Sequence, residues 1–226
     1  MNNQTPIELF TNGIEAMKKK EYKIAETYFL RSLYKISLSD ISNSADTYNL
    51  ALIGSIDNLS LHLYPEINFD FNKERALRFY EIFSKIDINV SWGYAQCLIK
   101  GIFDKPNYKE ALIHLSKAPH YAQVYTLASL FHKGIGLEKN DEFTIKLLKS
   151  RRAKISHIAQ KTYDLCTEIG LEFNFESYIN KELEAEVDLI LETVFENKKS
   201  AIVNNLSREI ILNEFFNNKL NIPSFD

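Results

Sequence analysis

Residues 122–150 read AQVYTLASLFHKGIGLEKNDEFTIKLLKS, and this stretch decides the fold. Leu127 and Phe131 are four residues apart, which is the spacing of an amphipathic helix rather than the alternation of a strand. Gly134-Ile135-Gly136 follows, and residues that tolerate positive φ commonly end a helix. Asn140 then precedes two acidic residues, a pattern typical of a helix N-cap and first turn. The stretch therefore predicts two helices joined by a short glycine turn.

The same pattern occurs 33 residues closer to the N-terminus. Tyr94-Ala95-x-x-Leu98-x-x-Gly101 matches Leu127-Ala128-x-x-Phe131-x-x-Gly134, and in the helices that follow Ala111 aligns with Thr144. A repeat of 33–35 residues built from two helices is typical of a stacked α-solenoid, because each helix pair buries its apolar face on the next pair.

Helix start and stop signals recur along the rest of the chain. Thr5-Pro6-Ile7-Glu8 combines a capping hydroxyl, a proline at the first helical position and a glutamate three residues after the cap. Asn72, Asn107 and Pro119 predict further helix starts, and Gly101 predicts a helix end. Only 7 Gly and 5 Pro occur in 226 residues, too few for the many special turns of an all-β fold. We therefore expect an all-α chain of ten or more helices.

The features of residues 122–150 resemble a Sel1-like repeat, which is a variety of the tetratricopeptide-type helix pair. The matching positions are Leu127-Ala128, Phe131, Gly134-x-Gly136, Leu137 and Asp141. Residues 90–118 resemble a second copy with Phe103 in place of the second glycine. Residues 6–37 are closer to an ordinary tetratricopeptide, and residues 45–86 match loosely. We expect an α-α superhelix of Sel1-like, tetratricopeptide-like repeats over residues 5–170 and a helical C-terminal cap over residues 171–222, because terminal repeats must shield the core.

Composition and motifs argue against several functional classes. The formal net charge of −3 disfavours a footprint on a nucleic-acid backbone. Cys97 and Cys166 form no CxxC pair and the five histidines no HExxH pair, so we expect no metal and no cofactor. Gly134-x-Gly136 lacks the strand, third glycine and GK[ST] ending of a phosphate loop.

MNNQTPIELF lacks the features of a secretory signal, and no apolar run reaches about 20 residues, so we expect a cytoplasmic protein.

An aromatic residue stands three positions before the small residue of each predicted repeat. In tetratricopeptides this site faces the concave groove, so the resemblance implies a partner-binding strip. Large, rigid aromatic side chains are common binding hot spots. The alternative is that these rings pack between repeats, and the sequence supports both equally. The four residues, with Trp92 as the strongest candidate, are Phe10, Tyr48, Trp92 and Tyr125.

Acidic residues crowd the stretch 182–192, and only Lys181 is a basic neighbour in the sequence. The simpler explanation is a solvated outer face. The alternative is a contact for a basic partner, made by residues such as Glu184 and Asp188 and steered electrostatically.

No sequence motif for nucleophilic or acid–base catalysis is present, so we expect a non-catalytic protein that binds a partner protein or peptide. The resemblance implies a narrower version, an immunity protein that neutralises a bacterial toxin, whose partner would be a basic toxin domain or effector. The alternatives are an RNA-binding helical repeat protein and an enzyme with an unrecognised site. We expect no nucleic-acid and no membrane partner.

Overall fold

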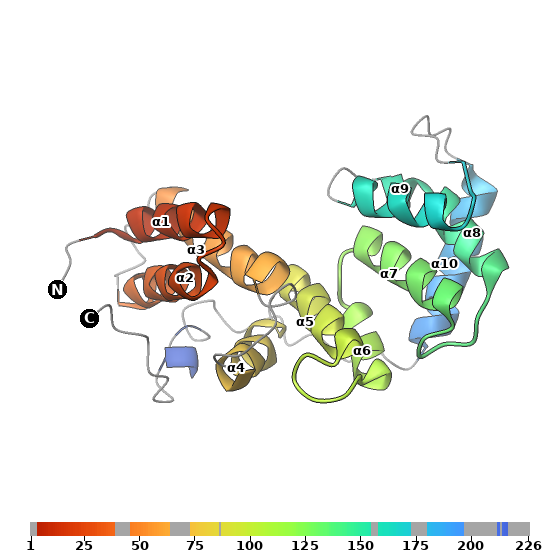
Figure 1. Cartoon of the computed structure of the whole chain (residues 1–226). Coiled ribbons are helices and arrows are strands. Elements are labelled where there is room, and N and C mark those ends of the chain that lie inside the picture. Colours follow the sequence, from red (N-terminus) through yellow and green to blue (C-terminus); the bar gives the residue numbers. More distant parts are fainter. Residues whose placement is uncertain are drawn as a thin grey trace. The chain divides into compact units, whose positions relative to one another are not determined.

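The structure is a computed structural model that describes residues 4–38, 46–63, 73–85, 87–154, 158–172, 180–196, 212 and 214–216. The side chains of residues 46–49 and 61–63 also lie outside the description. All regular secondary structure in these ranges is helical, and the labelled α-helices have 8 to 16 residues (Figure 1). This confirms the predicted all-α class.

The described chain divides into two compact units. Unit 1 contains helices α1 (Pro6–Lys18), α2 (Tyr22–Ser37), α3 (Asp46–Asp57), the π-helical segment η2 (Asn58–Leu63), α4 (Lys73–Phe83), α5 (Ile88–Lys100) and, from the C-terminal part, residues 212 and 214–216. Unit 2 contains α6 (Tyr108–Leu115), α7 (His120–Lys133), α8 (Asp141–Lys149), the 3-10 segment η3 (Arg151–Lys154), α9 (Ala159–Glu168) and α10 (Lys181–Phe195).

The predicted helix boundaries are confirmed where they fall in the described residues. Thr5 and Glu8 form a complete capping box at the start of α1. Asn107 and Asn140 accept backbone N–H groups at the starts of α6 and α8, and Pro119 precedes α7. Gly101 and Gly134 end α5 and α7 with φ of 66° and 61°, the left-handed conformation in which a Cβ atom is strained. Asn72 lies outside the described residues.

In unit 1, α1 packs side by side with α2 because one position lacks a side chain (Figure 1). A Cβ atom on Gly13 would lie 2.5 Å from the ring of Phe29, so only glycine allows this approach. The Ser32 hydroxyl of α2 donates to the Pro6 carbonyl of α1 at 2.9 Å. A buried ion pair joins α2 to α4, with Glu26 and Arg75 at 3.2 Å and side chains 2% and 10% exposed.

Aromatic side chains form the other part of the unit 1 core. Tyr80 of α4 stacks on Tyr94 of α5 with ring centroids 5.1 Å apart, and its hydroxyl donates to the Ser60 carbonyl of η2 at 2.7 Å. The Cys97 thiol lies 3.5 Å from the same hydroxyl. Cys97 is therefore a buried core thiol.

In unit 2, α7 packs on α8 through a small residue. Ala128 is fully buried, and the hydroxyl of Thr144 lies 3.4 Å from its carbonyl oxygen. Phe131 and Phe143 meet edge to face at 5.4 Å. The predicted alignment of the helix pair is thus consistent with a close α7–α8 contact at Ala128.

The two units are grouped by contacts and leave the predicted division between residues 170 and 171 a prediction. α10, from the predicted cap, lies in unit 2, whereas residues 212 and 214–216 lie in unit 1. The boundary after Pro106 also falls inside the predicted repeat 90–118, between α5 and α6. Residues 212 and 214–216 belong to unit 1 because they are buried there. Phe215 is 1% exposed and contacts Phe79 and Phe83 of α4.

Candidate functional site

A cleft of about 360 Å³ opens in unit 2 where the end of α7, the start of α8 and the end of α9 come together. We call it the α7–α9 cleft. Its lining combines polar and apolar side chains from three segments of the chain: His132, Lys139, Asp141, Thr144, Ile145, Ile169, Gly170 and Leu171.

Local sequence signals position the cleft. Gly134 ends α7 just after His132, and the Asn140 cap places Asp141 in the first turn of α8, so these two side chains meet across the connecting loop. At the third side, Gly170 has a φ of 71° and follows the end of α9. The Leu171 N–H then donates to the Cys166 carbonyl at 2.8 Å, which turns the chain back toward α9.

Charges of both signs surround the polar side of the cleft. His132 lies between two carboxylates, with Nδ1 3.9 Å from Asp141 and Nε2 3.7 Å from Glu168. Lys139 lies 3.4 Å from Asp141, and Lys133 lies 3.9 Å from Glu168. Both histidine distances exceed the reach of about 2.6–3.2 Å that proton transfer requires. In this arrangement the groups can bind polar atoms of either charge, and His132 lies between the two carboxylates without a hydrogen bond to either.

The apolar side of the cleft is accessible to solvent. Ile145 is 37% exposed on α8, and Ile169 and Leu171 are half-buried at the end of α9. Concave sites that combine apolar walls with a few placed polar groups are typical of ligand binding. The α7–α9 cleft is therefore a candidate ligand site in unit 2.

Of the predicted aromatic strip, Trp92 is buried, whereas Phe10 and Tyr125 are half-buried. Phe10 lies 6.1 Å from Phe29 and against Gly54, whose added Cβ atom would come within 2.6 Å of the Phe10 ring. Trp92 is 8% exposed, a burial that favours the alternative of packing between helices. Tyr125 is half-buried, and burial, with added effects of Asp164 and Glu168, raises its pKa. The side chain of Tyr48 lies outside the described residues, and partner binding by these four residues remains a prediction.

The predicted acidic contact has basic neighbours within its own unit. Arg152 of η3 lies 2.6 Å from Asp188 and 3.4 Å from Glu184, and the Arg151 N–H donates to Glu184 at 2.7 Å. The hydrogen bond from Arg152 is the main reason why the pKa of Asp188 is lowered. Glu184 and Asp188 thus contact η3, which the sequence interpretation missed because it considered only neighbouring residues. Binding of a basic partner by these two residues remains a prediction.

Two further titratable side chains, Cys166 and His114, have shifted pKa values. Burial raises the pKa of the Cys166 thiol, which makes it a poor nucleophile. Burial lowers the pKa of His114 to about 4. Among the residues that the structure describes, no group of three His, Cys, Asp or Glu side chains is placed to hold a metal ion. His157 lies outside those residues, as does the side chain of His62.

Sequence reasoning missed the cleft as a site. It named Asp141 only as a position of the repeat, counted His132 only among the five histidines, and attached no function to Lys139, Ile145, Ile169 or Leu171. The available signal was the glycine turn between His132 and Asp141, because a short connection brings the end of one helix near the start of the next. No pattern in the neighbouring sequence indicates that the end of α9 lines the same cleft.

Comparison with known proteins found no family model, no curated protein and no solved structure that matches this chain. The Sel1-like resemblance therefore remains a prediction. In the described ranges, every helix is too short or too polar to cross a membrane.

Proposed function

We propose that this chain is a non-catalytic, cytoplasmic binding protein whose α7–α9 cleft holds a peptide segment of a partner protein. The observation that carries the proposal is the exposed Ile145 beside His132, Lys139 and Asp141. A peptide offers such a cleft an apolar side chain for Ile145, and charged or amide groups for its polar side. A volume of about 360 Å³ fits a few side chains, at the small end of ligand pockets.

The proposal includes a solenoid arrangement of the helix pairs, which the 33-residue sequence repeat supports. Its narrower version is an immunity protein that neutralises a bacterial toxin. That version predicts that expression of this chain protects cells that produce the toxic protein encoded by a neighbouring gene. Killing that is unchanged by expression of the chain would contradict it.

The cleft is tested with a displayed library of random peptides selected on the full chain. Peptides that bind the wild type should lose at least tenfold in affinity on Ile145→Lys, because a charge then replaces the apolar contact that Ile145 offers in the cleft. Leu189→Lys is the matched control, since Leu189 is 63% exposed on α10 of the same unit and does not line the cleft. Equal binding to both variants, or no selected peptide, would refute the cleft as the binding site.

The same cleft supports a second candidate, an enzyme. The specific observation is the convergence of His132, Asp141 and Glu168. The enzyme hypothesis predicts turnover of hydrolysable ester, amide or phosphate substrates that is lost in His132→Gln. Turnover that persists in this variant would exclude His132 as the catalytic group.

A further inference from the structure

A short segment after α10 in the sequence packs in unit 1. Leu212 is fully buried and Phe215 is 1% exposed, and they are three residues apart, the spacing of one helix face. Residues 214–216 are helical and lie beside α4 (Figure 1). Phe83, the last residue of α4, and Leu212 are 129 positions apart in the sequence.

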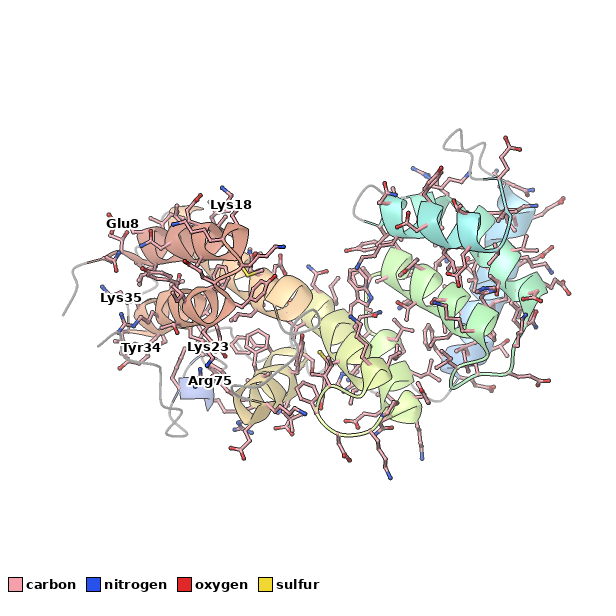
Figure 2. The ribbon with its side chains drawn as sticks, viewed as in Figure 1. Glu8, Lys18, Lys23, Tyr34, Lys35 and Arg75 are labelled. Carbon is pink, nitrogen blue, oxygen red and sulfur yellow. The ribbon has the colours of Figure 1, made fainter. Side chains whose placement is uncertain are left out.

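The surface that receives this segment is aromatic. Phe215 meets Phe79 at 6.0 Å and Phe83 at 5.4 Å, both edge to face. Phe216 meets Tyr34 of α2 edge to face at 5.3 Å. We call Tyr34, Phe79 and Phe83 the aromatic face. Tyr34 lies at the C-terminal part of α2 in Figure 2, on the side where the segment packs.

An ion pair between α4 and the segment orients the segment on this surface. Arg78 of α4 lies 3.8 Å from Glu214, with side chains 35% and 39% exposed. An exposed pair of this kind contributes little affinity but fixes direction and register. The segment thus presents three features to unit 1: a buried aliphatic residue, an acidic residue that pairs with Arg78, and two adjacent aromatic residues that meet the aromatic face.

This is the geometry of a helix bound to a protein surface by apolar anchors on one side. The anchors come from a segment attached through a chain connection to unit 2, and fifteen residues (197–211) separate it in sequence from the end of the α10 region at Glu196. A tethered ligand benefits from an effective concentration in the millimolar range. A free helix of the same chemistry can replace it when that helix binds more tightly or is more abundant.

We propose that the aromatic face is a protein-binding site, that residues 212 and 214–216 occupy it as an intramolecular ligand, and that its partner presents a helix with the same chemistry. That helix carries an aliphatic residue, an acidic residue two positions later and two aromatic residues directly after. The proposal adds a second binding site in unit 1 and does not depend on the α7–α9 cleft, so each can fail alone.

The experiment uses a fluorescent peptide with the sequence of residues 207–221, SREIILNEFFNNKLN. Its binding is measured by anisotropy with the full wild-type chain and with a full-length variant that carries Leu212→Asp and Phe215→Asp. The charges keep the segment of the variant off the aromatic face, so the peptide should bind the variant at least tenfold more tightly than the wild type. A peptide that carries the same two changes should bind neither protein.

Two further variants locate the contact. Tyr34→Ala in the opened chain should weaken peptide binding about three- to tenfold, because one edge-to-face ring pair is lost. Tyr34 is 38% exposed, so its removal leaves the fold intact. Ile145→Lys in the opened chain should leave peptide binding unchanged, which separates this site from the cleft.

Trp92 fluorescence reports whether unit 1 remains folded, because Trp92 is the only tryptophan. If the opened chain is unfolded but folds when the peptide is added, the proposal is supported. An opened chain that stays unfolded with the peptide shows that the segment is an integral part of the core, and this overturns the proposal. A folded opened chain that does not bind the peptide overturns it as well. A wild-type dimer that the two changes convert to a monomer would assign the segment to a second copy and overturn the intramolecular assignment.

Discussion

Lowering the pH should destabilise unit 2 through His114. This histidine lies on α6 and is partly buried, and burial, assisted by the nearby Lys117, lowers its pKa from 6.5 to about 4. A charged imidazolium would lose hydration at this position. The perturbation is a change of pH from 7 to 4 at constant ionic strength.

The direction and the size of the stability change follow from the protons that the folded and the unfolded chain bind. Between pH 6.5 and 4 the unfolded chain binds a proton at His114 that the folded chain does not bind, so the free energy of unfolding falls as the pH falls. Each pKa unit corresponds to about 1.4 kcal/mol. The shift of His114 from 6.5 to about 4 therefore removes roughly 3 kcal/mol across this window. Below pH 4 this group contributes no further loss.

The assay is amide hydrogen exchange on α6 and α7, compared between the wild type and His114→Gln at pH 7, 5.5 and 4. Other groups titrate in the same range, so the measured quantity is the difference between the two proteins. We expect the wild type to lose about 3 kcal/mol more protection than the variant. His120→Gln is the matched control, because His120 is exposed on α7. Parallel pH profiles for the wild type and His114→Gln would refute the reasoning.

Three further substitutions test the packing of the helices. Ala128→Leu should lower the stability of unit 2 by about 1–3 kcal/mol, because the fully buried alanine faces Thr144; an unchanged melting temperature would contradict the close contact. Glu26→Gln should lower the free energy of unfolding by about 3–5 kcal/mol, measured by urea unfolding with Trp92 fluorescence, since the buried Arg75 guanidinium loses its ionic partner. If the cost of the double variant with Arg75→Met were the sum of the two single costs, the pair would not be coupled. Trp92→Ala should cost about 3–5 kcal/mol of stability as a core residue; weaker partner binding with an intact fold would instead support the predicted strip.

Much of the helical framework could be predicted because its signals are local. The Thr5–Glu8 capping box and the Asn140 cap each operate over three residues, and Gly134 acts through its own backbone conformation. Such signals can be read in one stretch of sequence. The repeat added a prediction about packing, and the burial of Ala128 is consistent with it.

The candidate site depends on pairs that are far apart in the sequence. His132 and Glu168 are 36 residues apart, as are Arg152 and Asp188, yet each pair is within 4 Å. No local pattern indicates that Arg152 lies against the acidic residues of α10. The sequence alone therefore predicts an outer face or a partner contact for the acidic stretch, and the structure adds that Lys146 and Arg152 pair with several of its carboxylates.

Residue type alone also could not separate binding side chains from core side chains. The chain has 15 Phe and 12 Tyr, so aromatic residues are common in every helix pair. A hot spot must be accessible before the partner binds, and the 8% exposure of Trp92 leaves little surface for contact, whereas Ile145 is 37% exposed. Phe79 and Phe83 present another case, since Phe215 from a segment distant in the sequence packs edge to face against both rings. Binding surfaces in this chain are therefore best sought at exposed apolar residues beside unlike charges and at faces covered by sequence-distant segments.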